Sequence, residues 1–100
     1  MKTAKELFSL DNRVAIVTGG RGLYGASISA GLCEMGAQVV IASRSGEKCE
    51  AYAAELRAAG YAAVGMSLDL NDDDSIKRFS AAVVERFGRI DILVNNAGIT

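Results

Sequence analysis

Four short apolar runs alternate along the chain with three longer segments in which apolar residues recur at helical spacing. The continuous runs are typical of strands buried on both faces, and they cover Arg13–Thr18, Gln38–Ala42, Ala62–Leu68 and Ile90–Val94. The intervening segments predict helices, which cover Leu23–Met35, Glu47–Ala59 and a stretch that opens at Asn71-Asp72-Asp73-Asp74 and ends at Gly88. The pattern therefore predicts the order β-α-β-α-β-α-β with short connections.

This order restricts the topology of the sheet. Strands separated by helices of this length must run parallel, with right-handed crossovers. The expected fold is α/β, a doubly wound parallel sheet in a three-layer α/β/α arrangement with strand order 3-2-1-4. In such sheets ligands bind beyond the carboxyl ends of the strands, here at the switch between the first and fourth strands.

Local signals refine the edges of this fold. Asp11-Asn12 indicates a turn after a leader of residues 1–12, and Ser45 is a plausible N-cap. We expect the apolar residues of the leader to dock on the sheet edge; they are Leu7, Phe8 and Leu10. The apolar positions of the third helix are Ile76, Phe79, Val83, Val84 and Phe87. The fourth strand is expected to form an exposed apolar sheet edge, which is an aggregation hazard.

Composition excludes several classes of function. The chain has 100 residues, enough for one small domain, and a net charge of −1 with mixed signs gives no basic field for nucleic acid. Histidine is absent, which excludes a His-based dyad, and Cys33 and Cys49 lack the CxxC spacing of a redox motif. Met1–Leu10 lacks the apolar core of a signal peptide, and no run approaches the ~18 residues of a membrane helix. We therefore expect a cytoplasmic protein that binds neither membrane nor nucleic acid.

A glycine-rich turn, Thr18-Gly19-Gly20-Arg21-Gly22-Leu23-Tyr24-Gly25, joins the first strand to the first helix. Gly19, Gly22 and Gly25 permit a reversal with φ > 0, close approach of the backbone to a pyrophosphate, and tight packing of helix on strand. Amide groups near Leu23 and Tyr24 would face the anion. The turn predicts a nucleotide site; the alternative is a tight turn without a ligand.

Together with this turn, two further motifs carry a resemblance: Asp69-Leu70 after the third strand and Asn95-Asn96-Ala97-Gly98 after the fourth. The three motifs look like the short-chain dehydrogenase/reductase family. The opening Leu7–Leu10, followed by Arg13–Gly19, is similar to sugar-acid and polyol reductases of the gluconate 5-dehydrogenase type. The resemblance implies a Rossmann-type fold in which residues 1–100 form the NAD(P)-binding first part of a longer domain. It also implies a homo-oligomeric enzyme that transfers hydride between a nicotinamide dinucleotide and a small carbonyl compound or secondary alcohol.

Two departures from the family pattern leave alternatives open. The spacing T-G-x-x-G-x-x-G, with Leu23 in a usual glycine slot, is more like the extended branch of sugar-nucleotide epimerases and dehydratases, whereas Asn-Asn-Ala-Gly belongs to the compact branch. The family's catalytic Ser and Tyr-x-x-x-Lys are also lacking, because the residues four positions after the three tyrosines are Ile28, Leu56 and Gly65. We expect the 100 residues alone to be inactive. A non-catalytic NAD(P)-binding regulatory module is a further alternative.

The residues after the second strand bear on the choice of cofactor. An NAD site usually carries an acidic residue about 20 residues after the glycine turn, where it accepts from the ribose 2′-hydroxyl. Ser43 occupies that slot and is neutral, while Arg44 offers a guanidinium suited to a phosphate. Arg21 would add a second cation, or it is a solvated loop charge. NADP is therefore predicted over NAD.

The resemblance assigns roles to the other two motifs. Asp69 resembles the acceptor of the adenine amino group, with the Leu70 backbone beside it; the alternative is that Asp69 begins the cap of the third helix. Asn95 is expected to tie the fourth strand to its neighbours through its side chain. Asn96, Ala97 and Gly98 would line the ribose and nicotinamide side, and the alternative there is a plain turn. Asp72-Asp73-Asp74 is interpreted as a solvated helix cap rather than a metal cluster.

Overall fold

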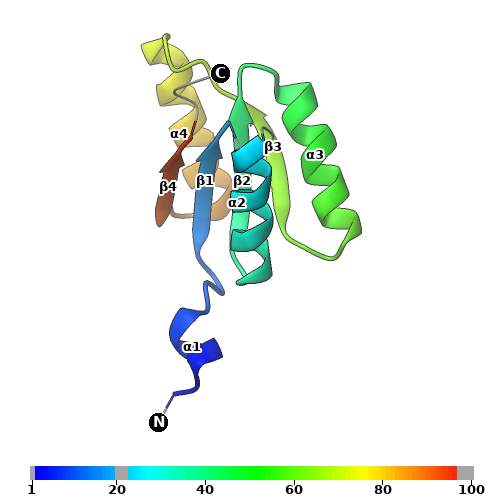
Figure 1. Cartoon of the computed structure of the whole chain (residues 1–100). Helices are drawn as coiled ribbons and strands as arrows, with labels where there is room; N and C mark the ends of the chain where they lie inside the picture. The colour runs from blue at the N-terminus through cyan, green and yellow to red at the C-terminus, as the bar shows by residue number, and fades with distance from the viewer. Residues whose placement is uncertain (1, 20–22, 97–100) are drawn as a thin grey trace.

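The computed structural model describes residues 2–19 and 23–96, and within them it contains a parallel sheet flanked by helices (Figure 1). The elements in chain order are α1 (Ala4–Phe8), β1 (Val14–Thr18), α2 (Leu23–Glu34), β2 (Gln38–Ser43), α3 (Gly46–Ala58), β3 (Ala63–Ser67), α4 (Asp73–Phe87) and β4 (Ile92–Asn95). The predicted alternation of strands and helices is confirmed, with most ends shifted by one or two residues. The short helix α1 was not predicted.

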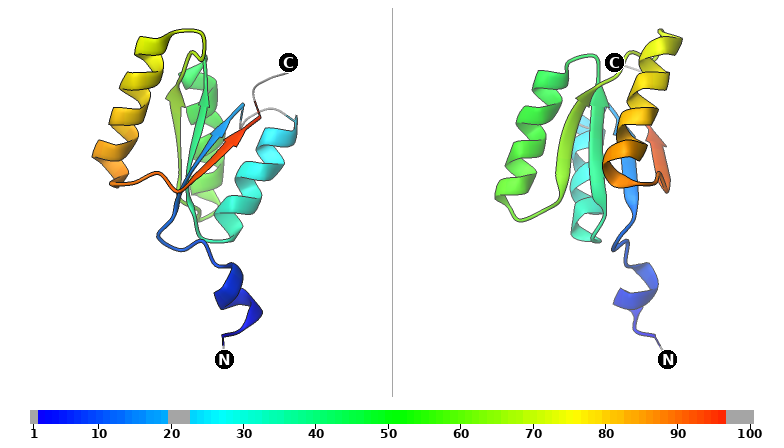
Figure 2. Two further views of the ribbon diagram at one scale, coloured as in Figure 1. Left: turned by 90° about the vertical axis from the view of Figure 1, so that its left-hand side faces the viewer. Right: turned by 180° about the vertical axis from the view of Figure 1, so that it is seen from behind.

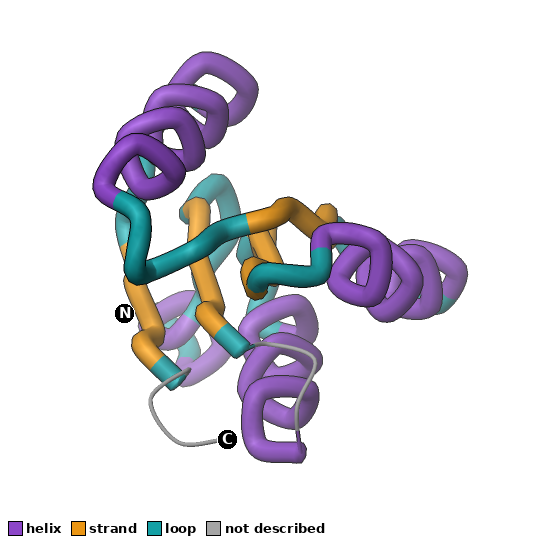
Figure 3. The backbone as a smooth tube through the Cα atoms, turned by 90° about the horizontal axis from the view of Figure 1, so that it is seen from above, coloured by secondary structure: helices purple, strands orange, loops and turns teal. Residues whose placement is uncertain are grey.

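The strands pair in the order β3-β2-β1-β4, and every pair is parallel. Helices α2 and α4 lie on opposite sides of the sheet (Figures 2 and 3), which gives the three layers of a doubly wound fold. The predicted fold class and strand order are confirmed. The carboxyl ends of all four strands therefore lie along one border of the sheet.

The core forms on both faces of the sheet, and β1 contributes to each. Ala15 and Val17 pack in a cluster with buried residues of α2 and α3, whereas Val14 and Ile16 pack in a second cluster with residues of α4. Alternate side chains of a strand point to opposite faces, so the continuous apolar run of β1 fills two cores. All five residues of β1 are buried.

Side-chain caps fix where two helices begin. The Ser45 hydroxyl accepts a hydrogen bond from the Lys48 amide at 3.3 Å, which confirms the predicted N-cap of α3. Asp72 caps α4, because its Oδ1 accepts from the amides of Asp74 at 3.0 Å and Ser75 at 3.4 Å. The acidic run thus opens a helix, as interpreted from the sequence.

The predicted docking of the leader on the sheet edge is wrong for Leu7 and Phe8. These side chains are 65% and 69% exposed, and α1 projects beyond the amino ends of the strands (Figure 1). Asn12 takes a left-handed conformation with φ 66°, and the turn it forms directs the preceding chain away from the sheet. Leu10 alone of the three packs against the core.

Two other exposed apolar side chains mark the limits of the helical and strand faces. Val84 on α4 is 48% exposed, because it sits one position beyond the buried Val83 and turns toward solvent. In β4, Ile92 and Val94 pack on the α2 side, and the alternate residue Leu93 is 65% exposed. The predicted apolar edge strand is confirmed.

The opposite edge of the sheet is covered by an ion pair. Glu50 on α3 accepts a hydrogen bond from the Gly65 amide at 3.2 Å, and Arg57 donates to the Ala63 carbonyl at 2.8 Å. The two side chains also bond each other through two contacts of 2.9 Å. These contacts with Arg57 are the main cause of the lowered pKa of Glu50. Two outward-facing backbone groups of β3 are therefore already satisfied.

The contact between α3 and β3 leaves no room for a side chain at Gly65, where an added methyl group would collide with the backbone of Cys49 and Glu50. We expect Gly65→Ala to lower the free energy of unfolding by about 1–3 kcal/mol in urea denaturation. Gly31→Ala is the matched control, because a methyl group there meets nothing within 4 Å. Its stability should hold or rise by about 1 kcal/mol. Equal stability of the two variants would contradict this packing.

Asp91 should give the stability a specific pH dependence. Its Oδ2 accepts from the Val14 amide at 2.8 Å and its Oδ1 accepts from Arg89 at 2.9 and 2.7 Å; the arginine first, then the amide, lowers the pKa of the carboxyl. This stabilisation is fully present above the ordinary carboxyl pKa and is lost as pH falls through the lowered pKa. The free energy of unfolding, measured in urea, should depend less on pH across the acid range in Asp91→Asn than in the wild type. Parallel pH profiles for the two proteins would contradict the assignment.

Candidate functional site

Residues that follow the four strands come together at the carboxyl border of the sheet, where the sequence predicted a nucleotide site. The predicted site residues that the structure describes there are Thr18, Gly19, Gly25, Ser43, Arg44, Asp69, Leu70, Asn95 and Asn96, together with the backbone of Leu23 and Tyr24. Arg21, Gly22, Ala97 and Gly98 lie outside the described residues. The described members come from separate loops that adjacent strands bring side by side.

The glycine-rich turn begins with a residue that only glycine accommodates readily. Gly19 has φ 67°, and its amide donates to the Ala42 carbonyl of β2 at 2.8 Å. Helix α2 starts at Leu23, and Gly25 is buried in its first turns. The chain therefore passes from buried strand to helix as the pattern predicted, and the amino end of α2 offers amide groups suited to an anion.

The hydroxyl of Thr18 joins β1 to the residues at the end of β4. Its Oγ1 accepts from the Asn96 amide at 3.0 Å and lies 3.3 Å from the Val94 carbonyl and 3.2 Å from Asn95 Oδ1, so its proton serves one of these two acceptors. Thr18 is 3% exposed. The expected tie through the Asn95 side chain is present, and it holds Asn95 and Asn96 beside the glycine turn.

The Ser43 hydroxyl is used inside its own turn. It accepts from the Ser45 amide at 3.3 Å, lies 3.4 Å from the Ser45 carbonyl, and contacts Cys49 Sγ at 3.0 Å. Cys49 is fully buried, and its contact with Ser43 was not predicted from the sequence. The spacing of six residues across a capped helix start is the signal that could have found it.

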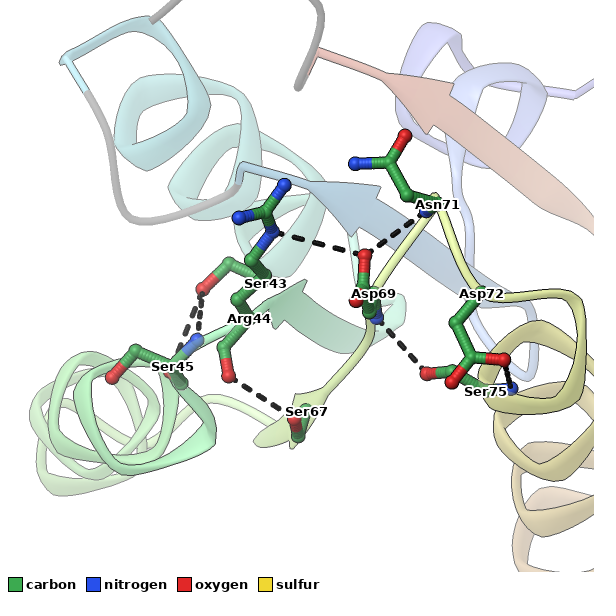
Figure 4. A network of polar contacts seen from close by, with 8 residues as sticks. All are labelled: Ser43, Arg44, Ser45, Ser67, Asp69, Asn71, Asp72 and Ser75. Carbon is green, nitrogen blue, oxygen red and sulfur yellow. Dashed lines mark hydrogen bonds and ion pairs between the residues drawn. The ribbon is translucent and has the colours of Figure 1, made fainter.

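Arg44 extends from the same turn with its side chain 76% exposed. Its Nε lies 3.7 Å from Asp69 Oδ1, and its carbonyl accepts from the Ser67 hydroxyl at 3.1 Å. Figure 4 shows the two terminal nitrogens of the guanidinium directed away from Asp69. No other acidic residue of the described chain forms an ion pair with Arg44.

Asp69 shapes the turn that leads into α4. Its Oδ1 accepts from the Asn71 amide at 3.0 Å, and its own amide donates to the Ser75 hydroxyl at 3.0 Å (Figure 4). Asp72, rather than Asp69, is the N-cap of α4. Asp69 contributes to the start of the helix only by shaping the turn that precedes the cap. Leu70 beside it is 46% exposed. Sequence reasoning missed Ser67, the last residue of β3, and Ser75, in the first turn of α4.

Two classes of feature are not found among the described residues. No group of three or more His, Cys, Asp or Glu side chains there is arranged to hold a metal ion. Within the same ranges, no helix has the length and apolar character needed to cross a membrane. The described residues of the border offer backbone amides, hydroxyl and amide side chains, and the Arg44–Asp69 pair.

With this geometry established, comparison with known proteins identifies the class. The sequence profile of the short chain dehydrogenase family matches residues 13–100, so the chain belongs to that family. It is 39% identical over 104 residues to the D-threitol dehydrogenase of Mycolicibacterium smegmatis, covering 99% of this chain and 40% of that protein.

Solved structures agree with the family. The RhlG/NADP active-site complex of Pseudomonas aeruginosa superposes with a TM-score of 0.84 at 41% identity, over 93% of this chain and 37% of that one. A metagenomic short-chain oxidoreductase in complex with NADP gives 0.83 at 42% identity, over 89% and 40%. The chain spans about two fifths or less of the length of the curated relatives it matches first.

The bond between Thr18 and Asn96 can be tested directly. Thr18→Val removes the oxygen that accepts the Asn96 amide, and we expect it to lower the free energy of unfolding by about 1–2 kcal/mol. Hydrogen exchange of the Asn96 amide should also be faster in this variant. Thr18→Ser keeps the hydroxyl and should keep the protection, whereas equal exchange rates in the valine and serine variants would contradict the bond.

Proposed function

We propose that residues 1–100 form the NADP-binding first part of a longer short-chain dehydrogenase/reductase domain. The single observation that carries the choice of NADP is the exposed guanidinium of Arg44 at the carboxyl end of β2, with the neutral Ser43 before it. A dianionic 2′-phosphate there would meet a permanent positive charge with donors in a planar fork. The similar solved structures of RhlG and of the metagenomic short-chain oxidoreductase, both complexes with NADP, support the same choice.

The remaining roles are proposed from the family resemblance together with the geometry of the described residues. The left-handed Gly19 and the amino end of α2, at Leu23 and Tyr24, would bind the pyrophosphate, with Gly22 and the buried Gly25 giving the backbone access. Thr18, by holding Asn95 and Asn96, would orient the ribose and nicotinamide side together with Ala97 and Gly98.

At the adenosine end, Asp69 would accept from the adenine amino group. Its Oδ1 already holds the Asn71 amide and faces Arg44, so Oδ2 is the oxygen proposed for adenine. The Leu70 backbone would lie beside the ring, and Arg21 would add a second cation near the 2′-phosphate. NAD, which lacks that phosphate, is proposed to bind more weakly.

The nicotinamide, when bound, supplies or accepts the hydride. The proposed reaction of the whole protein is transfer of that hydride to or from a carbonyl group or secondary alcohol, in a cytoplasmic homo-oligomer. A sugar-acid or polyol substrate is the specific proposal, supported by the resemblance of the opening segment and by the identity to a dehydrogenase named for D-threitol. The proton donor would be a Ser and Tyr-x-x-x-Lys set outside these residues.

A regulatory module that binds NAD(P) without turnover is the second candidate, because a nucleotide-binding fold does not by itself imply catalysis. Polyol oxidation by the full-length protein with NADP, followed as NADPH absorbance, distinguishes the two. Turnover supports the enzyme. Tight NADPH binding without turnover on polyols, sugar acids or simple ketones supports the module.

Arg44→Gln tests the choice of cofactor. It removes the charge proposed to bind the 2′-phosphate, and we expect NADPH affinity to fall about ten- to hundredfold. NADH affinity should change less than about twofold, since NADH offers no phosphate at that position. Both dissociation constants can be measured by nucleotide fluorescence titration of the full-length protein.

Arg78→Gln is the matched control, because it removes an equal charge from an exposed position on α4. It should leave both affinities unchanged. An equal loss of NADPH affinity in the two variants would mean that net charge, rather than Arg44, governs binding.

A further inference from the structure

Arg44, in the turn after β2, is joined to the end of β3 and the loop beyond it through both its backbone carbonyl and its side chain. The Ser67 hydroxyl donates to the Arg44 carbonyl at 3.1 Å, and Asp69 Oδ1 lies 3.7 Å from Arg44 Nε. Figure 4 shows these contacts from two successive parts of the chain, the last residue of β3 and the loop beyond it. The backbone and the side chain of Arg44 are thus held by the same neighbouring segment.

Close packing makes the turn and the strand end a single unit. A Cβ added at Gly46 would lie 3.1 Å from the Ser67 amide nitrogen and 3.2 Å from Ser67 Cβ, so the turn lies directly against Ser67. The Leu68 amide also donates to the Ser43 carbonyl at 2.7 Å. A substitution at Ser67 is therefore expected to alter the turn that carries Arg44 without altering a residue proposed to contact the nucleotide.

The ion pair with Asp69 occupies one side of the guanidinium. Nε faces Asp69, and the two terminal nitrogens point away from it (Figure 4). An unrestrained arginine loses much rotamer freedom when it binds a phosphate. An arginine already held in one orientation loses less, so its affinity for the phosphate is higher.

We propose that Ser67 and Asp69 are positioning residues that raise the preference for NADP over NAD by holding Arg44. This rests on the proposed function, in which Arg44 binds the 2′-phosphate. Ser67 fixes the Arg44 backbone and Asp69 fixes the direction of its guanidinium. The guanidinium would lie between the Asp69 carboxylate and the phosphate, where its positive charge offsets the repulsion between the two anions.

Ser67→Ala gives the cleanest test, because it changes no charge. In the full-length protein, the ratio of the NADH to the NADPH dissociation constant should fall about two- to fivefold. Ser67→Thr keeps a hydroxyl and should restore the ratio. In an Arg44→Gln background, Ser67→Ala should have no further effect, whereas a general loosening of the site would lower the binding of both nucleotides in either background.

Asp69→Asn tests the second contact. It keeps an oxygen to accept the Asn71 amide but removes the charge that faces Arg44, so the ratio should again fall about two- to fivefold. Asp74→Asn removes an equal charge from the first turn of α4 and should leave the ratio unchanged.

A ratio that stays constant or rises in either variant overturns the role of the residue changed, and so does an equal fall in the Arg44→Gln background. These results would leave the wild-type preference for NADPH intact. A wild-type protein that prefers NADH would instead overturn the proposed function, and this inference with it.

Discussion

The structure depends on the position of β1, which is paired on both sides and packed on both faces. Its neighbours are β2 and β4, and its five residues, Val14–Thr18, are all buried. A strand held from four directions cannot shift without disturbing two cores. The turn that begins at Gly19 therefore leaves the sheet from a fixed point.

The polar side chains of the carboxyl border divide into those that build the loops and those that remain available to a ligand. The hydroxyl groups of Thr18 and Ser43 are hydrogen-bonded to neighbouring backbone and side-chain atoms. Arg44 has only a long, exposed contact with Asp69. Its terminal nitrogens point away from that carboxylate, so an anion can engage them while the ion pair stays in place. The loop-building residues give the border its shape, and Arg44 adds an exposed positive charge to it.

The alternation of apolar runs and helical spacing was sufficient to predict the fold, because each strand is buried and each helix has one packed face. The turn at Gly19 and the cap at Asp72 were also predictable, since each depends on a local backbone requirement. The exposure of Leu7 and Phe8 was not, because it depends on the direction in which the turn at Asn12 sends the chain. The partnership of Ser67 with Arg44 joins residues 23 positions apart, and only the pairing of β2 with β3 brings them together.

The two lateral edges of the sheet, formed by β3 and β4, differ in how readily another strand could pair with them. Along β3, the Gly65 amide and the Ala63 carbonyl are hydrogen-bonded to Glu50 and Arg57. Another strand could pair there only after displacing these two side chains, which also form an ion pair. Along β4, the side chain of Leu93 is exposed at the rim. Among the described residues, one lateral edge of the sheet is therefore closed to a further strand by α3, whereas the other leaves an apolar side chain on which a further strand could pack.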